Sequence, residues 1–252
     1  MESQGNKRSA LLIIGNEILS GRTLDKNTQY IGHKMGVHGV PLSEVRVVPD
    51  VEETIVETLN EMRERYDFVF TTGGIGPTHD DITSASVAKA FGVGFGRHAG
   101  AHDILLEHYG EADLTEARAS MADMPVSDDF ELILNPVSSA PGFRIGNVFV
   151  MAGVPKIMQG MLDHVLEMIT PGQSLLSDNI TIDAPESELA KLLGDVQKQF
   201  TDIDLGSYPQ FKPDGGWAVN VVARGLNEDR IKECLSVLGS RLDEEGVSYE
   251  TA

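Results

Sequence analysis

The feature that most constrains the fold of this chain is an alternation of short apolar runs with segments of helical periodicity, which continues to about residue 171. Ser9–Ile14 (SALLII) is a continuous apolar run closed by Gly15, which is typical of a strand buried on both faces. Further strands are predicted at Val45–Val48 and Asp67–Thr72, and the segments between them carry apolar residues at helical spacing. This order predicts an α/β fold in which a largely parallel sheet is covered by helices on both faces.

The order of the predicted strands and helices changes after Thr170–Ser174, a segment with proline and glycine that we interpret as a linker. Beyond it, strands and helices are expected in the order β-α-β-β-α, which predicts a small α+β domain. The predicted ranges are Asn179–Ile182, Pro185–Phe200, Ile203–Tyr208, Trp217–Ala223 and Asn227–Leu242. We therefore expect two domains, residues 1–171 and residues 172–252.

The charge balance is strongly acidic, because 20 Lys and Arg face 39 Asp and Glu in 252 residues, a formal net charge of −19. Binding to nucleic acid or to anionic lipid usually needs a cationic surface, so neither partner is expected. The single cysteine, Cys234, excludes an intramolecular disulfide and a zinc site built from cysteines, and its place on an apolar helix face predicts a core residue. No apolar stretch approaches the roughly 20 residues of a membrane span, and we expect a cytoplasmic protein.

The segment Thr71–Thr83 (TTGGIGPTHDDIT) carries the strongest signal of function. It follows a predicted buried strand and precedes a helix predicted over Thr83–Phe91, and ligands of open α/β sheets bind at such strand ends. Gly73, Gly74 and Gly76 allow the backbone to approach a ligand closely, and the N-terminus of the helix adds partial positive charge. These features favour a phosphate or another anion.

Asp80 and Asp81 in the same loop would repel a bare phosphate, because two adjacent carboxylates are negative. A divalent cation such as Mg²⁺, Co²⁺ or Mn²⁺ would resolve this conflict, since carboxylate oxygens hold hard cations that bridge to phosphate. The alternative is purely structural: one of the two aspartates caps the helix and the glycines form a turn. The loop lacks the Gly-Lys-Ser/Thr of a P-loop and the spacing of a dinucleotide fingerprint, and the chain has no G-x-S-x-G.

Polar residues also follow the other predicted strands. After the first strand, Glu17 could hold a metal or orient a hydroxyl group, and Asn16 could donate to a phosphate or a pterin. Asp50 follows the second strand, and its structural alternative is a helix N-cap that forms a capping box with Glu53. Gly153 lies in a turn between a predicted strand and a helix, so its amide could form a further anion-binding edge.

Together these segments resemble the molybdenum-cofactor biosynthesis (molybdopterin-binding) domain family. Within it they are most similar to the CinA-type branch, which includes the N-terminal region of competence/damage-inducible protein A and the molybdopterin-binding-like domain of FAD synthases. The matching segments are Gly15–Gly21 (GNEILSG), Asp25–Asn27 (DKN), Val48–Asp50 (VPD), Gly73–Thr83 (GGIGPTHDDIT), Gly153–Pro155 (GVP) and Leu205–Pro209 (LGSYP). They cover nearly the whole chain, and GGIGPTHDD is specific to this branch.

The resemblance implies a three-layer α/β sandwich of the MoaB/Mog type around a mostly parallel sheet, assembled as a homo-oligomer, a dimer or a trimer. It implies metal-dependent hydrolysis of the diphosphate of ADP-ribose or FAD with release of AMP. In this hypothesis Asp81, Asp50 and Glu17 are catalytic, and Asp80 joins Asp81 in holding the metal. The residues expected to bind phosphate or nucleotide are Gly73, Gly74, Gly76, Thr78, Asn16, Asn27 and Gly153.

Two alternatives remain beside this hypothesis. One is adenylyl transfer to molybdopterin, although the adenylyltransferases of the family carry a GGTG…RD version of the loop. The other is a non-catalytic module that binds a pterin or a nucleotide. Departures near Gly153 keep this module open, because Ala152 stands where many relatives have proline and Ile157 replaces a glutamate.

Overall fold

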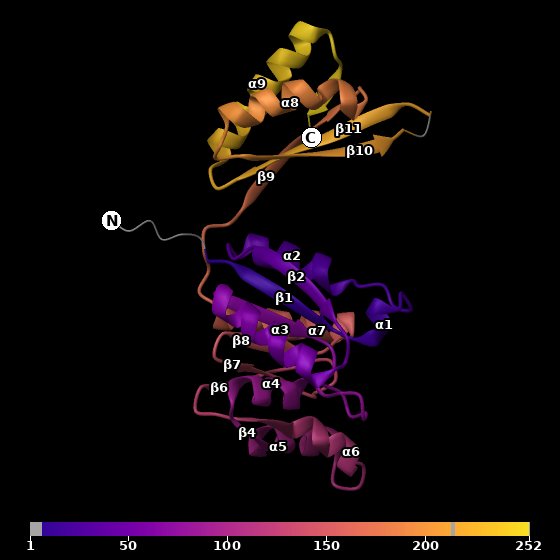
Figure 1. Ribbon diagram of the computed structural model, residues 1–252, viewed down its shortest axis with the longest axis vertical. Helices are drawn as coiled ribbons and strands as arrows, with labels where there is room; N and C mark the ends of the chain where they lie inside the picture. Colours follow the sequence, from indigo (N-terminus) through magenta and orange to yellow (C-terminus); the bar gives the residue numbers. More distant parts are fainter. Residues whose placement is uncertain (1–6, 213–214, 252) are drawn as a thin grey trace, which may run out of the picture. The chain divides into compact units, whose positions relative to one another are not determined.

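The computed structural model describes residues 7–212 and 215–251, and the chain divides into two compact units, Met1–Gly172 and Gln173–Ala252 (Figure 1). The outer bounds of the two expected domains, residues 1 and 252, lie outside the described residues. Two clusters of buried apolar side chains form the core of unit 1, and a third forms the core of unit 2. Over the described ranges, no helix combines the length and the apolar character that a membrane crossing requires.

A six-stranded sheet forms the centre of unit 1, with strand order β2-β1-β3-β8-β7-β6. The first four strands in this order pair in parallel, whereas β7 is antiparallel to both of its neighbours. The strands are β1 (Ser9–Ile14), β2 (Leu42–Val48), β3 (Phe68–Thr72), β6 (Phe130–Ile133), β7 (Gly142–Ile145) and β8 (Val148–Met151). The mostly parallel sheet expected from the sequence is therefore confirmed.

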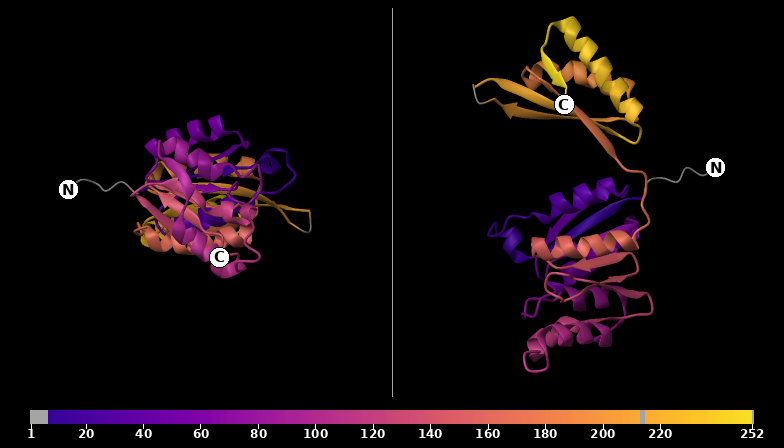
Figure 2. Two further views of the ribbon diagram at one scale, coloured as in Figure 1. Left: turned by 90° about the horizontal axis from the view of Figure 1, so that it is seen from below. Right: turned by 180° about the vertical axis from the view of Figure 1, so that it is seen from behind.

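Helices cover both faces of this sheet, because successive side chains of a strand point to opposite faces. Leu11 and Ile13 of β1 pack in the core that α2 and α7 complete, and Leu12 and Ile14 pack in the core that α3 and α4 complete. In Figure 1, α3 lies in front of the sheet, and in the reversed view of Figure 2, α7 lies in front. The helices are α1 (Asn16–Leu19), α2 (Asn27–Val37), α3 (Glu52–Arg65), α4 (Thr83–Phe91) and α7 (Pro155–Met168). The result is the expected three-layer sandwich.

An insertion between α4 and β6 adds a small lobe to unit 1. Its strands β4 and β5 form an antiparallel two-stranded ribbon, and its helices lie between them in the chain. The elements are β4 (Gly94–Arg97), α5 (Ala99–Tyr109), α6 (Glu116–Ala119), a 3-10 turn (Ser120–Ala122) and β5 (Asp123–Val126). The lobe covers the same face of the sheet as α4, since Ala101, Leu105 and Met124 belong to that core.

Unit 2 is an antiparallel sheet with strand order β10-β11-β9-β12, packed against α8 and α9. Its elements are β9 (Leu176–Ile182), α8 (Glu186–Gln199), β10 (Asp204–Phe211), β11 (Trp217–Gly225), α9 (Glu228–Glu245) and β12 (Tyr249–Thr251). The predicted α+β domain is confirmed, with β12 as an additional edge strand. Cys234 lies in its core as expected, and burial raises the pKa of its thiol to about 11.

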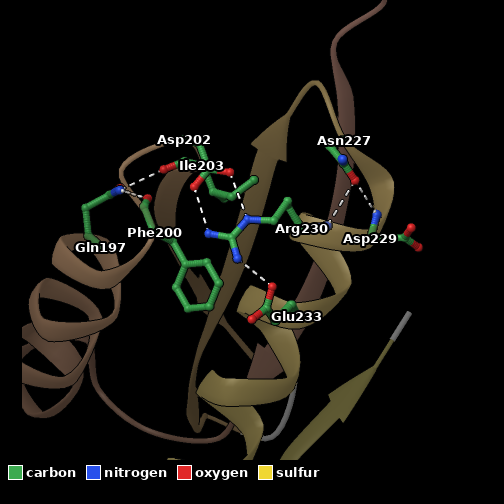
Figure 3. A network of polar contacts seen from close by, with 8 residues as sticks. All are labelled: Gln197, Phe200, Asp202, Ile203, Asn227, Asp229, Arg230 and Glu233. Atoms are coloured by element: carbon green, nitrogen blue, oxygen red, sulfur yellow. Dashed lines mark hydrogen bonds and ion pairs between the residues drawn. The ribbon is translucent and has the colours of Figure 1, made fainter.

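A polar network joins the turn after α8 to the first turn of α9 (Figure 3). The Arg230 guanidinium donates two hydrogen bonds, of 2.9 and 3.0 Å, to the Asp202 carboxylate, and it also forms an ion pair with Glu233. The Arg230 guanidinium lies 4.8 Å from the centre of the Phe200 ring. This hydrogen bonding lowers the pKa of the Asp202 carboxyl group, because the bonds favour its charged form.

Candidate functional site

The loops that follow β1, β3 and β8 meet at one edge of the unit 1 sheet. The amide of Gly73 donates to the carbonyl of Met151 at 3.3 Å, and a Cβ atom at Gly153 would lie 3.1 Å from the Cα of Gly73. Asn27, which begins α2, donates from its side-chain amide to the carbonyl of Gly153 at 2.8 Å. Neighbouring parallel strands end at the same edge, so residues far apart in the sequence are brought together there.

Two glycines at the end of β3 are required by the backbone. Gly73 and Gly74 have φ values of 103° and 67°, in the region that favours glycine. A Cβ atom at Gly73 would lie 2.1 Å from the carbonyl oxygen of Ile14, and one at Gly74 would lie 2.2 Å from Oγ1 of Thr83. Thr83 also closes the loop, because its hydroxyl and its amide donate to the carbonyls of Gly73 and Gly74, both at 2.9 Å. The loop is therefore folded back onto the first residue of α4.

The N-terminus of α4 carries no side-chain cap. Ile82 is its N-cap residue, and neither Asp80 nor Asp81 accepts a hydrogen bond from the first turn of the helix. Asp81 instead accepts from the amide of Thr78 at 2.8 Å. The structural alternative of a capping aspartate is therefore wrong. Among the described residues, no side chain therefore offsets the partial positive charge at this helix end by capping it.

The two aspartates share a partner in the hydroxyl of Thr78. Oδ1 of Asp80 and Oδ2 of Asp81 each lie 2.6 Å from Oγ1 of Thr78. A hydroxyl group has one hydrogen, so it satisfies only one of these two oxygens at a time. The hydrogen bond from Thr78 is the main cause that lowers the pKa of the Asp80 carboxyl group. The two carboxylate groups are thus close together at the hydroxyl of Thr78. The neighbouring His79 is 99% exposed and faces solvent.

A cavity of about 570 Å³ opens beside this loop. Of the residues expected to act or bind there, six line it: Glu17, Gly73, Gly74, Gly76, Asp81 and Gly153. The remaining walls are largely apolar and come from the loop after β8, the β6–β7 connection, the inserted lobe, the glycine loop itself and the α1–α2 connection. Their lining residues are Thr23, Ile75, Pro77, Tyr109, Arg118, Met121, Asn135, Ser138, Ala140, Ala152, Val154, Pro155 and Ile157.

Asp50 does not line the cavity, and neither do Asn16, Thr78 and Asp80. The alternative that Asp50 caps the following helix is also wrong, since Val51 is the N-cap residue and no side chain caps α3. Oδ2 of Asp50 instead accepts from the amide of Asn16 at 2.8 Å. This bond ties the start of α1, which carries Glu17, to the end of β2.

Asn27 lines a second, small cavity of about 50 Å³, which shares Glu17, Gly73 and Gly153 with the large one. Its side chain is 6% exposed. Its amide nitrogen bonds to Gly153, but its Oδ1 atom finds no donor among the described residues. A buried acceptor without a donor is costly, so this oxygen is suited to a water molecule or to a polar group of a ligand.

The donor set available for a metal is small. The described residues hold no group of three or more His, Cys, Asp or Glu side chains arranged to bind a metal ion. Asp81 lines the cavity, and Asp80, outside the lining, shares with it the hydroxyl of Thr78, so these two carboxylates lie close together. Mg²⁺ is often held by one or two carboxylates together with substrate phosphates and water. The residues present therefore fit a cation that arrives with a phosphorylated ligand, and they do not form a complete cage.

Sequence reasoning missed the walls that lie far from the strand ends. Arg118 and Tyr109 belong to the inserted lobe, and Asn135 lies in the β6–β7 connection. Asn135 holds that connection in place by donating to Ser138 and to the carbonyl of Ala140, at 2.7 and 2.8 Å. The Asn-Pro sequence at 135–136 was a usable turn signal for this residue. Nothing in the helical pattern of the lobe indicates which side chains face the cavity.

Comparisons with known proteins agree with this architecture. Residues 10–171 match the family described as "Probable molybdopterin binding domain", and residues 174–251 match "FAD synthase, middle domain". A protein of Aeropyrum pernix is 34% identical over 81% of this chain and 79% of its own length. The "Probable FAD synthase" of Caenorhabditis elegans is 29% identical over 82% of this chain but only 44% of its own length.

A solved structure supports the same assignment for the first unit. The protein CinA of Thermoplasma acidophilum, whose function is given as unknown, superposes with a TM-score of 0.60 and 35% sequence identity. The match covers 65% of this chain and 98% of the CinA chain. The chain therefore belongs to the molybdopterin-binding domain family, in its CinA-type branch, and carries the FAD synthase middle domain as its second unit.

Proposed function

We propose that this protein is a metal-dependent nucleotide pyrophosphatase that cleaves the diphosphate of ADP-ribose or FAD and releases AMP. The observation that carries the proposal is that Asp81, Glu17 and the glycine loop line one cavity beside the uncapped start of α4. The similarity to a probable FAD synthase and to the FAD synthase middle domain supports a dinucleotide with a diphosphate as the ligand.

In this proposal, residues of the chain bind the phosphates, activate the attacking water and hold the cation. The amides of Gly74 and Gly76 and the N-terminus of α4 bind phosphate oxygens, and they stabilise the negative charge that develops on them. Glu17 accepts a proton from the water that attacks phosphorus. Asp80 and Asp81 would hold the divalent cation, which polarises a phosphoryl oxygen when bound. One water molecule is consumed as one P–O bond breaks, so ADP-ribose yields AMP and ribose 5-phosphate, and FAD yields AMP and FMN.

A direct assay tests this proposal. Purified protein is incubated with ADP-ribose or FAD and with Mg²⁺, Co²⁺ or Mn²⁺, and AMP is quantified over time. We expect Asp81→Asn to lower kcat by roughly a hundredfold or more, because it removes a carboxylate that holds the cation acting on the phosphoryl oxygen. Asp103→Asn is the matched control, since Asp103 is exposed on α5 and lies outside the cavity. No AMP with any of the three metals, or full activity in Asp81→Asn, would contradict the proposal.

A second candidate is a module that binds a pterin or a nucleotide without turnover. The observation in its favour is that the described residues offer no group of three or more metal-binding side chains. Calorimetry that detects binding of ADP-ribose or a pterin, combined with no product over hours, would favour this module. Adenylyl transfer to molybdopterin would instead be recognised by adenylylated pterin formed from ATP.

A further inference from the structure

One wall of the cavity is built by the inserted lobe, which carries α5 and α6 (Figure 1). Tyr109 ends α5, and Arg118 lies on α6. The Arg118 guanidinium is 4.5 Å from the centre of the Tyr109 ring, and its Nη1 atom donates to the carbonyl of Asp113 at 2.6 Å. A stacked ring and a carbonyl thus hold this cation from two directions, so it is positioned before any ligand arrives.

The charge of Arg118 is not neutralised by an ion pair with any of the described residues. No carboxylate pairs with it in the part of the chain that the structure describes, whereas Arg97 in the same lobe pairs with Asp123 and Glu116. Among the described side chains that line the cavity, Arg118 is the one cation, and the two charged residues that share the lining with it, Glu17 and Asp81, are acidic. Its Nε and Nη2 atoms make no hydrogen bond to the described residues, so they are available as donors.

From this arrangement we infer that Arg118, stacked on Tyr109, binds the diphosphate of the ligand from the wall that the inserted lobe contributes to the cavity. The inference rests on the proposed function for the identity of the ligand. In a protein of net charge −19, an anion entering a site with two acidic side chains meets a repulsive field. A fixed guanidinium offsets that field, and its planar fork matches phosphate oxygens. The ligand class is accordingly a nucleoside diphosphate derivative, with the apolar wall left for its ring system.

The test measures binding in the absence of metal, so that no turnover is needed. Calorimetry compares the affinity of ADP-ribose for the wild-type protein with that for Arg118→Ala and Arg118→Lys. We expect Arg118→Ala to raise Kd by about tenfold to a hundredfold, the effect of one charged hydrogen-bonding partner. Arg118→Lys should fall between the two, because lysine keeps the charge but lacks the fork. Lys156→Ala is the matched control, since Lys156 is an exposed cation on α7 next to two lining residues but outside the lining itself, and its Kd should stay within about twofold of wild type.

A second readout separates an anion contact from a structural role, because Arg118 also braces the chain at Asp113. If Arg118 meets the diphosphate, raising the ionic strength weakens binding to the wild-type protein more than binding to Arg118→Ala. A purely structural role would lower the affinity equally at every ionic strength. Equal affinity in wild type and Arg118→Ala, an unchanged salt dependence, or no binding of ADP-ribose to the metal-free wild type would overturn the inference.

The same preparations distinguish this inference from the proposed function. Wild-type protein that binds ADP-ribose in an Arg118-dependent way but releases no AMP with any metal would contradict the proposed pyrophosphatase and support the role of Arg118. If the wild type releases AMP, and Arg118→Ala has the same KM and the same Kd as the wild type, the result would support the proposed pyrophosphatase and contradict the role of Arg118.

Discussion

At the scale of single residues, the need for glycine in the loop after β3 can be measured as the loss of stability on substitution by alanine. Gly74 has a left-handed φ and would also place a Cβ atom 2.2 Å from the hydroxyl of Thr83, whereas Gly92 has a similar φ of 65° with nothing within 4 Å. Gly92→Ala should therefore cost about 1–2 kcal/mol of unfolding free energy from its backbone conformation alone. Gly74→Ala should cost that amount plus the displacement of Thr83, roughly 1–3 kcal/mol more.

Urea unfolding of the two glycine variants, followed by circular dichroism, checks this difference. Equal loss of stability in Gly74→Ala and Gly92→Ala would mean that the loop can move away from α4 without cost. Such a loop would not be the rigid anion-binding loop that the proposed function requires, although Thr83 bonds to it in the structure.

Asp50 offers a second test at this scale, because its contact with the amide of Asn16 suggests a positioning role for the loop that carries Glu17. Asp50→Ala removes the acceptor and is expected to lower kcat about tenfold to a hundredfold, with little change in KM, since a misplaced base slows the chemical step. Asp50→Asn keeps an oxygen that can accept from Asn16 and should recover most of the activity. An Asp50→Asn variant as slow as Asp50→Ala would show that the negative charge itself is needed, as for a residue that touches the metal or the substrate.

The same residues show how far sequence reasoning reached into the site. Glu17, Asp81 and the glycines line one cavity because each belongs to a loop that follows a strand, and parallel strands share one edge. Their roles in binding and catalysis stay predictions. The N-cap alternative for Asp50 was wrong because its carboxylate accepts a hydrogen bond from the loop after the neighbouring strand instead. That loop is brought close to Asp50 only when the sheet has formed. Arg118 and Tyr109 could not be predicted, because their role depends on how the lobe folds against the sheet edge.

At the scale of elements, β1 and β3 were predictable because their apolar runs are nearly continuous and buried. β4 was not, since two of its four residues are glycine and it is largely exposed, so it carries no apolar pattern. β12 spans three residues and is too short to register as a strand. Short edge strands take their conformation from their pairing partners, β5 and β9, rather than from their own composition.

The link between α8 and α9 in unit 2 provides a pH-dependent prediction. The pKa of Asp202 is lowered in the folded state by its hydrogen bonds with Arg230, so the pair contributes stability above the unfolded-state pKa of about 4. That contribution is lost as pH falls through the folded-state pKa. We therefore expect the Tm difference between wild type and Asp202→Asn to be present at neutral pH and to shrink steadily below about pH 4.

Asp178→Asn in β9 is the control for this measurement, because Asp178 is exposed and takes part in no ion pair among the described residues. Thermal scans of the three proteins between neutral and acidic pH give the comparison. A difference between wild type and Asp202→Asn that stays constant down to the lowest pH would contradict the account of this network.

At the scale of the whole molecule, assembly remains a prediction from the family resemblance. A homo-oligomer, a dimer or a trimer, is expected, and light scattering coupled to size-exclusion chromatography measures it directly for this 252-residue, 27.3 kDa chain. We expect a mass two or three times that of one chain, independent of concentration across the micromolar range. A mass of one chain at every concentration would contradict it.

The central claim is that one cavity gathers the carboxylate of Asp81, the amides of the glycine loop and the cation of Arg118 around a diphosphate. The most direct test is a crystal structure of the protein with a non-hydrolysable analogue of ADP-ribose and Mg²⁺. The account predicts the diphosphate between Gly74–Gly76 and Arg118, with a metal ion on Asp81. A diphosphate bound elsewhere on the molecule, or one within the cavity that contacts neither the loop nor Arg118, would contradict it.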